Sequence, residues 1–325
     1  MTDFSVVICT YNGEHRLPKL LDRLRSQITP HDLTWEILIV DNNSQDQTAR
    51  YISQQQQQHW SSPWPLRYKF EPRQGLAYAR RCAIQNIHSQ LVGFLDDDTL
   101  PANNWVAQAY DFAQRHPEVG AYGSAINGQY ESQPPKGFER IASCLAVIQR
   151  GDTAFQYDTG LLPAGAGMVI RRQAWLDCIP AEPDLTGVCG ASLNAKGEDI
   201  ETLSYIRQGG WSIWHNPQMQ LTHVIPAHRL RPSYLLRLFQ SIGNSRYPLR
   251  RLRYRPWQRP IMLLLHSLND LRKLIVHIAE TQQLQPTDIV TACERTLLVH
   301  SLMSPIKGQR VNAIMQFVNF YNTIR

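Results

Sequence analysis

Short apolar runs alternate with helical stripes along the first hundred residues, and this order limits the chain to few folds. Residues 4–10 predict a buried strand, and leucines spaced three and four apart over 17–24 predict an amphipathic helix. Further strands are predicted at 35–40, 66–70 and 91–95, with helical segments between them. Repeated units of strand and helix build a parallel, doubly wound sheet. We therefore expect an α/β fold whose sheet is mostly parallel.

The pattern becomes mixed after Pro101. The elements expected there are a helix to about residue 116, strands near 120–127 and 168–170, and a helix from about Glu198. Ser44 and Gln47, earlier in the chain, fit a capping box that opens the second helix. We place all of these elements in one domain over residues 1–225, whose halves divide near residue 115. A helical region over 226–325 follows.

The helical region begins within a long stretch that carries no acidic residue. From Thr202 to Asn269 there is no Asp or Glu, and ten arginines lie there. The rest of the chain has 23 basic residues against 27 acidic ones, so the formal charge of +6 comes from this stretch. Such a distribution predicts an anionic partner, whether phosphate, anionic lipid or nucleic acid.

The composition and the first residues of the sequence exclude several classes of protein. The 43% share of hydrophobic residues suffices for a buried core. The six cysteines form no C-x-x-C pair, which argues against a zinc knuckle or a secreted disulfide framework. The first residues lack a basic leader pattern, and the longest apolar run, 261–265, is too short to cross a bilayer. We expect a cytoplasmic protein without a membrane-spanning helix.

Polar side chains follow three of the predicted strands. Thr10 and Asp41 end the first and second, and Asp96, Asp97 and Asp98 end the fourth. Strand ends of a parallel sheet meet in one crevice, where ligands bind. Three adjacent carboxylates repel one another unless a cation lies among them, so Asp96 and Asp98 are candidates to hold Mg²⁺ or Mn²⁺ together with substrate phosphates, with Asp97 pointing elsewhere. A solvated acidic turn is the alternative interpretation.

Glu198 and Asp199 open the predicted helix near residue 198. Carboxylates at a helix N-terminus are stabilised by the helix dipole, so capping alone explains them. Catalysis is the other explanation. One acidic group, the aspartate triplet, would hold a metal and phosphate, and the second acidic group would remove a proton. His223, which follows a strand predicted at 219–222, is a structural histidine or a ligand, and Arg229 suits bidentate phosphate contact.

Five motifs along the first 230 residues resemble the family 2 glycosyltransferases, which have a GT-A fold. They are SVVICTYN at 5–12, IVDNNS at 39–44, GLAYAR at 75–80, LDDD at 95–98, and GEDIE at 197–201 with the later Gly210-Trp211. Each motif alone is weak, and the five in order make the resemblance specific. The chain departs from the family pattern at Arg81 and Ala83, where Asn and Gly are usual. This departure concerns the details of donor contact.

The resemblance implies a role for each matching residue. Thr10, Tyr11, Asn12 and Glu14 would line a nucleotide-sugar site with Arg80, Asp96 and Asp97, and Asp41 would bind the base. Asp96, Asp98 and His223 would hold the metal, and Arg229 the diphosphate. Asp199 would be the general base beside Glu198, and Trp211, Gly165 and Gly167 would form the acceptor side. Residues 1–115 would then bind the nucleotide sugar and 116–225 the acceptor.

The resemblance also implies a reaction. It is an inverting, metal-dependent transfer, with Mn²⁺ or Mg²⁺, from a nucleoside-diphosphate sugar to a hydroxyl of a glycan or lipid-linked acceptor in polysaccharide synthesis. UDP is the nucleotide that the family favours. The long basic tail is similar to that of transferases of cyanobacterial hormogonium polysaccharide synthesis. It suits a peripheral position on the anionic inner face of the cytoplasmic membrane, where each basic residue adds about 1 kcal/mol, and no nucleic acid is expected.

Two other functions stay open at this point. A nucleotidyltransferase also combines an α/β sheet with acidic metal ligands, but a glycine-rich basic loop is expected after its first strand, where this chain has Tyr11 to Glu14. A non-catalytic protein could instead bind nucleic acid or a membrane surface through the basic segment 229–259. Tyr247, Tyr254 and Trp257 lie among its arginines, as in stacking surfaces for single strands.

Overall fold

A computed structural model describes residues 2–60, 63–158, 160–189, 193, 196–282 and 286–323, and the backbone alone at 58–59 and 307–323. Its strands are β1 Phe4–Thr10, β2 Trp35–Asp41, β3 Leu66–Phe70, β4 Leu91–Asp96, β5 Thr99–Pro101, β6 Val119–Tyr130, β7 Phe155–Gln156, β8 Met168–Arg171 and β9 Ser212–Ile225. Its α-helices are α1 Leu17–Arg25, α2 Thr48–Gln54, α3 Leu76–Asn86, α4 Trp105–Arg115, α5 Arg172–Cys178, α6 Glu198–Gln208, α7 Pro232–Leu252, α8 Arg259–Thr281 and α9 Ile289–Thr323.

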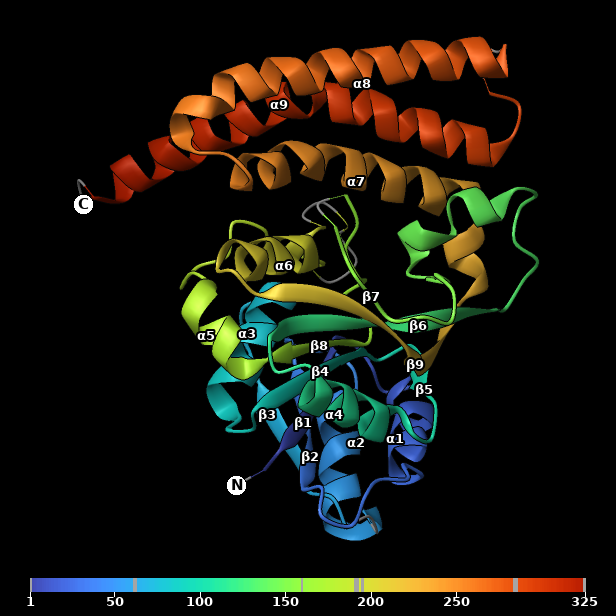
Figure 1. The fold of residues 1–325 in the computed structure, drawn as a ribbon, viewed down its shortest axis with the longest axis vertical. Helices are drawn as coiled ribbons and strands as arrows, with labels where there is room; N and C mark the ends of the chain where they lie inside the picture. Colours follow the sequence, from blue (N-terminus) through green and yellow to red (C-terminus); the bar gives the residue numbers. More distant parts are fainter. Residues whose placement is uncertain are drawn as a thin grey trace.

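One sheet runs through the centre of the molecule in the order β3-β2-β1-β4-β8-β6-β9-β5, and β7 pairs with β9 (Figure 1). The first four strands are parallel. The remaining strands are mixed, since β8 is antiparallel to both of its neighbours and β6 is parallel to β9. The predicted α/β fold is confirmed. The wholly parallel part is the first half, where strands and helices alternate along the chain.

The two faces of the sheet are covered by different helices. Phe4, Val6 and Ile8 of β1 pack on one side with the buried side chains of α1, α2 and α4. Val7 of the same strand packs on the other side with α3, α5 and α6. Figure 1 shows these helices on the two sides of the sheet. Both faces of β1 are buried, which explains why its sequence is an unbroken apolar run rather than an alternating one.

The last hundred residues form a helical layer over one edge of the sheet, as expected (Figure 1). α7 lies against the rest of the molecule, and α8 is the outermost helix. Leu235, Leu238 and Phe239 of α7 pack against Val290 and Cys293 of α9 in a separate apolar core. No helix of the described residues is long and apolar enough to cross a membrane.

The arginines of segment 229–259 do not form one exposed basic face. Arg229 bonds to Asp98, Arg250 is paired with Asp270, and burial lowers the pKa of Arg246. The interpretation of the whole segment as a binding surface for nucleic acid or membrane is therefore wrong for these positions. Several of its charges stabilise the fold and the site instead.

Two local predictions were wrong. Helix α2 begins at Thr48, and Ser44 is not its cap, because the Ser44 hydroxyl accepts a hydrogen bond from the backbone N–H of Asn12 at 2.9 Å. His223 does not lie beyond a strand. It lies within β9, opposite Thr99 of β5. This pairing places His223 beside the aspartates that follow β4.

Candidate active site

The ends of the parallel strands bring the predicted polar residues together. Thr10 is in register with Asp41 on β2, and Cys9 with Asp96 on β4, so the three strand ends lie side by side. A cavity of about 270 Å³ opens there. Its lining includes Thr10, Tyr11, Arg16, Asn42, Asp96, Asp97, Asp98, Leu145, Lys196, His223, Arg229, Tyr234 and Leu238. The predicted crevice is therefore present, and α7 supplies part of its wall.

Asp97 is held by the protein itself. Arg16 donates to both of its carboxylate oxygens, at 2.8 and 2.9 Å, and the Thr10 hydroxyl donates at 2.5 Å. Arg16 also bonds to the carbonyl of Tyr11. Asp97 lines the cavity, but its oxygens are engaged within the protein, so it stabilises the loop after β1.

Asp98 faces a histidine and an arginine from the far end of the domain. Arg229 Nη1 lies 2.7 Å from one oxygen of Asp98, and His223 Nε2 lies 3.5 Å from the other. Burial alone raises the pKa of Asp98, but hydrogen bonding to His223 and the charge of Arg229 hold that pKa well below its usual value. His223 Nδ1 lies 2.8 Å from the carbonyl of Leu145. A carbonyl only accepts, so Nδ1 donates to Leu145, and Nε2 is the ring nitrogen that faces Asp98.

Asp96 is the last residue of β4 and lies near both Asp98 and Arg80. Burial and the nearby Asp98 raise its pKa, opposed by Arg80. No group of three or more His, Cys, Asp or Glu side chains is arranged as a metal cluster within the part of the chain that the structure describes. Asp98 and His223 are the pair whose donor atoms already face each other.

A second group of charges surrounds Arg80. Its side chain is 3% exposed and lies 3.5 Å from Glu198. Arg80 also interacts electrostatically with Asp96 and Asp199. Burial raises the pKa of Glu198 to about 7, with Asp199 adding to the rise and Arg80 opposing it. Arg80, expected near the nucleotide, thus lies as a buried cation between the triplet and the acids of α6.

Asp199 is oriented by backbone groups at the start of α6. The N–H of Gly165 donates to Oδ2 at 3.0 Å, and the N–H of Ile200 donates to Oδ1 at 2.8 Å. An added Cβ at Gly165 would lie 2.6 Å from Arg80 Nη2 and 3.0 Å from Asp199 Cβ. Gly165 therefore lies beside Asp199, and a side chain at this position would press on Arg80 and Asp199.

Trp211 and Gly167 lie elsewhere. Asp199 lies near the start of α6, and Trp211 follows its other end, which is about 14 Å along the helix from Asp199. Trp211 packs against Gly120 of β6. Gly167 is buried under the site, where its N–H bonds to the carbonyl of Phe94 and an added Cβ would meet Leu221 at 2.0 Å. Both residues contact the core, and their acceptor-side role stays a prediction.

On the nucleotide side, Asp41 and Asn12 connect the first two loops. One oxygen of Asp41 accepts from the Tyr68 hydroxyl and the other from the N–H of Ser44, both at 2.9 Å. Asn12 has a φ of 51°, and its side-chain oxygen accepts from the N–H of Gln45. Asp41 is thus almost wholly buried and engaged inside the protein.

Glu14 belongs to the same connection. One of its carboxylate oxygens accepts from the N–H of Gln47 at 3.3 Å, and its own N–H bonds to Asp46. Glu14 is thus placed between the first loop and the start of α2.

Several residues of the cavity were not predicted. Asn42 bonds to the N–H of Gly75 and the carbonyl of Arg73, and so joins β2 to α3. Asn42 lies in the IVDNNS motif at 39–44, so the sequence could have identified it as a candidate site residue. Arg16, Tyr234 and Leu238 carry no local signal, since they reach the cavity only through the packing of α1 and α7.

The sequence model of glycosyl transferase family 2 matches residues 5–179, more than half of the chain. The chain belongs to this family. The succinoglycan biosynthesis protein ExoM of Rhizobium meliloti is 22% identical to it over 241 residues, which cover 72% of this chain and 71% of that protein. The uncharacterized glycosyltransferase YfnE of Bacillus subtilis is 31% identical over 227 residues, covering 68% of this chain but only 54% of that protein.

Solved structures show the same fold for this family 2 glycosyltransferase. The mannosyltransferase PcManGT from Pyrobaculum calidifontis, in complex with GDP-Man and Mn²⁺, is 18% identical with a TM-score of 0.59, and the match covers 94% of this chain and 88% of that one. Residues 1–349 of S. aureus TarS, in complex with UDP-GlcNAc, are 13% identical with a TM-score of 0.51, covering 95% and 92%. The GT-A assignment is confirmed, and the enzyme is a transferase.

Proposed function

We propose that this glycosyltransferase moves a sugar, with inversion at the anomeric carbon, from a nucleoside-diphosphate sugar to a hydroxyl of a glycan or lipid-linked acceptor in polysaccharide synthesis. The single observation that carries the proposal is the pair of acidic groups joined through Arg80, one beside the cavity and one at the start of α6. A transfer reaction needs these two functions, charge neutralisation at the leaving group and proton removal at the attacking one.

Asp199 is the proposed general base. Its carboxylate is fixed by the N–H groups of Gly165 and Ile200, and it is partly exposed, whereas Glu198 is buried. In the proposed reaction Asp199 accepts the proton of the acceptor hydroxyl as that oxygen attacks the anomeric carbon from the side opposite the diphosphate. Single displacement of this kind inverts the anomeric centre and needs no side-chain nucleophile.

Asp98 and His223, with Asp96 nearby, are the proposed ligands of Mn²⁺ or Mg²⁺. The donor set fits, because a carboxylate whose pKa is held low faces Nε2 of an imidazole whose Nδ1 is hydrogen-bonded to the carbonyl of Leu145. When bound, such a cation neutralises charge on the departing diphosphate. Arg229 lies against Asp98 and would contact the same phosphates.

The identities of the nucleotide and the acceptor are proposed from the similar proteins and the sequence motifs. Similar solved structures hold GDP-Man or UDP-GlcNAc, and we propose a UDP-sugar because the sequence motifs favour it. ExoM is a succinoglycan biosynthesis protein, which supports a polysaccharide product. We propose that the enzyme acts in the cytoplasm, at the inner face of the membrane.

The experiment is release of nucleoside diphosphate from a panel of UDP-, GDP- and dTDP-sugars with Mn²⁺, with Mg²⁺ and with a chelator. The proposal predicts turnover of one donor class, loss of that turnover with the chelator, and an unchanged rate in Asp111→Asn, a control that removes an exposed carboxylate of α4. Turnover that is indifferent to the chelator would refute the metal role. Absence of binding to every donor would refute the function.

A further inference from the structure

Helix α8 carries its apolar side chains outward. Seven large apolar residues of this helix are exposed: Ile261, Leu264, Leu265, Leu268, Leu271, Ile275 and Val276. At 100° per residue they share an arc of about 140°, and they extend over about 23 Å of helix. Trp257, just before the helix, is 68% exposed. Isolated exposed apolar residues are ordinary, but a continuous stripe marks a contact surface.

The opposite face of α8 holds polar groups inside the protein. Asp270 is fully buried and accepts from Arg250 of α7 at 2.6 and 2.9 Å. His266 Nε2 lies 3.0 Å from the hydroxyl of Tyr254. A surface helix normally turns its apolar stripe to the core and its charges to water. α8 instead exposes seven large apolar side chains and buries Asp270, so its outer face suits an apolar medium.

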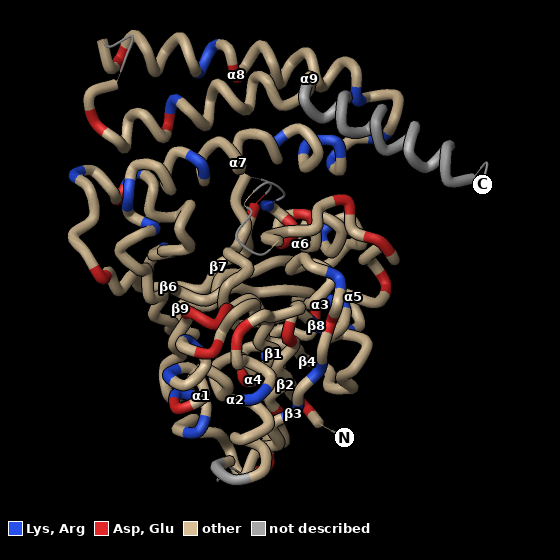
Figure 2. Tube along the Cα trace, turned by 180° about the vertical axis from the view of Figure 1, so that it is seen from behind, with Lys and Arg blue, Asp and Glu red and all other residues tan. Residues whose placement is uncertain are grey.

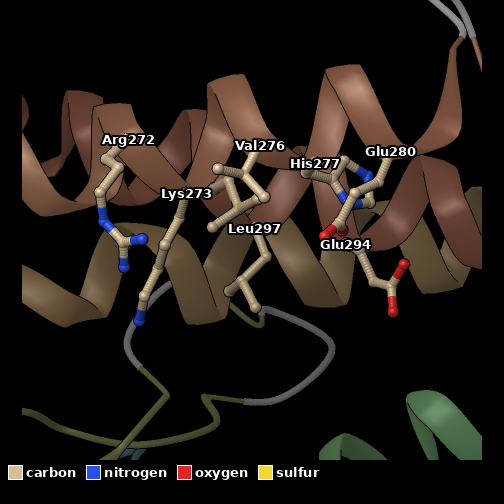
Figure 3. A pocket seen from close by; sticks show the side chains of 8 residues that line it. Arg272, Lys273, Val276, His277, Glu280, Glu294 and Leu297 are labelled. Atoms are coloured by element: carbon tan, nitrogen blue, oxygen red, sulfur yellow. The ribbon is translucent and has the colours of Figure 1, made fainter.

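Cations lie within and beside this apolar stripe, since Arg272 falls inside the arc of the seven apolar residues. Arg253 and Arg255 are exposed where α7 turns into α8, and Figure 2 shows Lys and Arg gathered at this corner. Arg272 and Lys273 project from α8 at one end of a groove of about 380 Å³ against α9, while Glu280 and Glu294 lie at its other end (Figure 3). Glu280 is the one exposed acid on α8. Most of the border therefore complements a negative surface.

We propose that α8 lies flat in the interface of an anionic lipid bilayer, with Leu264, Leu265 and Leu268 among the acyl chains and the arginines at the phosphates. Apolar residues on one side, basic residues beside them and a tryptophan at the end are the features of an interfacial helix. The docking element is thus the outer face of α8 rather than the basic segment as a whole.

A second copy of this chain is the competing occupant. Its own stripe would bring a second set of arginines, and Glu280 is the one exposed acid of α8 that could meet them, because Asp270 is buried and residues 202–269 contain no acid. The membrane proposal rests on the proposed function only for the identity of a lipid-linked acceptor. Vesicle binding needs no sugar, so its failure is distinguishable from failure of the transferase assignment.

The test is flotation of the full chain with vesicles of phosphatidylcholine alone or with about a third phosphatidylglycerol, in low salt and in about 1 M salt, where the Debye length is about 3 Å. We expect binding to the mixed vesicles that high salt weakens but does not abolish. Leu264→Gln with Leu268→Gln should lower the partition constant at least about hundredfold, since burial of one leucine is worth about ten- to hundredfold.

The matched control is Leu161→Gln with Leu176→Gln, at positions that are 50% and 51% exposed outside α8. It should bind like the wild type, and circular dichroism should show both double variants folded. Equal binding by the two double variants, or no binding by the wild type, overturns the proposal. A dimer in lipid-free solution that the α8 variant converts to a monomer also overturns it, in favour of a second copy.

Discussion

At the scale of single residues, the site is an arrangement of buried carboxylates that each have an arginine. Arg16 pairs with Asp97, Arg229 with Asp98 and Arg80 with Glu198. Three adjacent aspartates at a strand end would otherwise repel one another. Because the arginines come from three different elements, the acidic edge is stable only in the complete fold. Arg229 alone of the three also reaches the proposed metal ligand.

The raised pKa of Glu198 predicts a pH dependence of stability. Burial raises this pKa from 4.5 to about 7, so between these values the folded protein keeps a proton that the unfolded chain releases. The wild type should therefore lose up to about 3 kcal/mol of unfolding free energy as pH rises from about 4.5 to above 7. Glu198→Gln should lack this loss. Urea unfolding of both proteins at pH 5 and pH 8 measures it, and parallel pH dependences would contradict the assignment.

Gly165 predicts a second residue-scale effect. In Gly165→Ala the new methyl group would press on Arg80 and Asp199, so we expect at least about a tenfold loss of transfer rate, in line with the sensitivity of reactions to misplacement of about 1 Å. Gly160→Ala is the control, since only the side chain of Asp158 lies near that position. Steady-state rates of both variants test this. A normal rate for Gly165→Ala would mean that Asp199 is not the base.

Much of the residue arrangement was predictable because strand register is a local property. Thr10, Asp41 and Asp96 end parallel strands, so their meeting follows once the strands are recognised. Arg16 and Tyr234 were not predictable, because their positions depend on how whole helices dock. The position of Trp211 relative to Asp199 was not predictable, because a motif gives the distance along the chain and not the length of the helix that separates the two residues.

At the scale of elements, the second half of the sheet and the last helices depart from simple patterns. β9 is a long strand that pairs with β6 on one side and with β5 and β7 on the other, and its length carries His223 back to the site. α8 departs further, since it buries Asp270 and exposes seven large apolar side chains. The apolar periodicity of α8 predicts a helix correctly, but periodicity cannot tell whether the stripe faces a core or another apolar medium.

The ion pair between α7 and α8 gives the prediction at this scale. Asp270→Asn should cost about 3 kcal/mol of unfolding free energy, because Arg250 keeps a partly buried charge without its partner. Arg250→Met with Asp270→Leu should recover most of that loss. Asp22→Asn, which removes an exposed partner of Arg25, should cost less than about 1 kcal/mol. Chemical denaturation compares them, and equal losses for Asp270→Asn and Asp22→Asn would contradict the structural role.

At the scale of the whole molecule, the site uses both the sheet and the helical layer. The family match ends at residue 179, yet Arg229, Tyr234 and Leu238 complete the cavity from beyond it. Residues on both sides of the predicted boundary near residue 226 therefore line one cavity. The α/β class and the helical tail followed from periodicity. The way in which α7 closes the cavity did not, because it depends on contacts between distant parts of the chain.

The most direct test of the central claim separates donor binding from transfer in two variants. With the donor found by the panel, calorimetry gives the donor affinity and single-turnover kinetics gives the transfer rate. The account predicts that Asp199→Asn binds donor like the wild type and transfers at least about a hundredfold more slowly, whereas Asp98→Ala loses metal-dependent donor binding. Transfer at the wild-type rate in Asp199→Asn, or unchanged metal-dependent binding in Asp98→Ala, would contradict it.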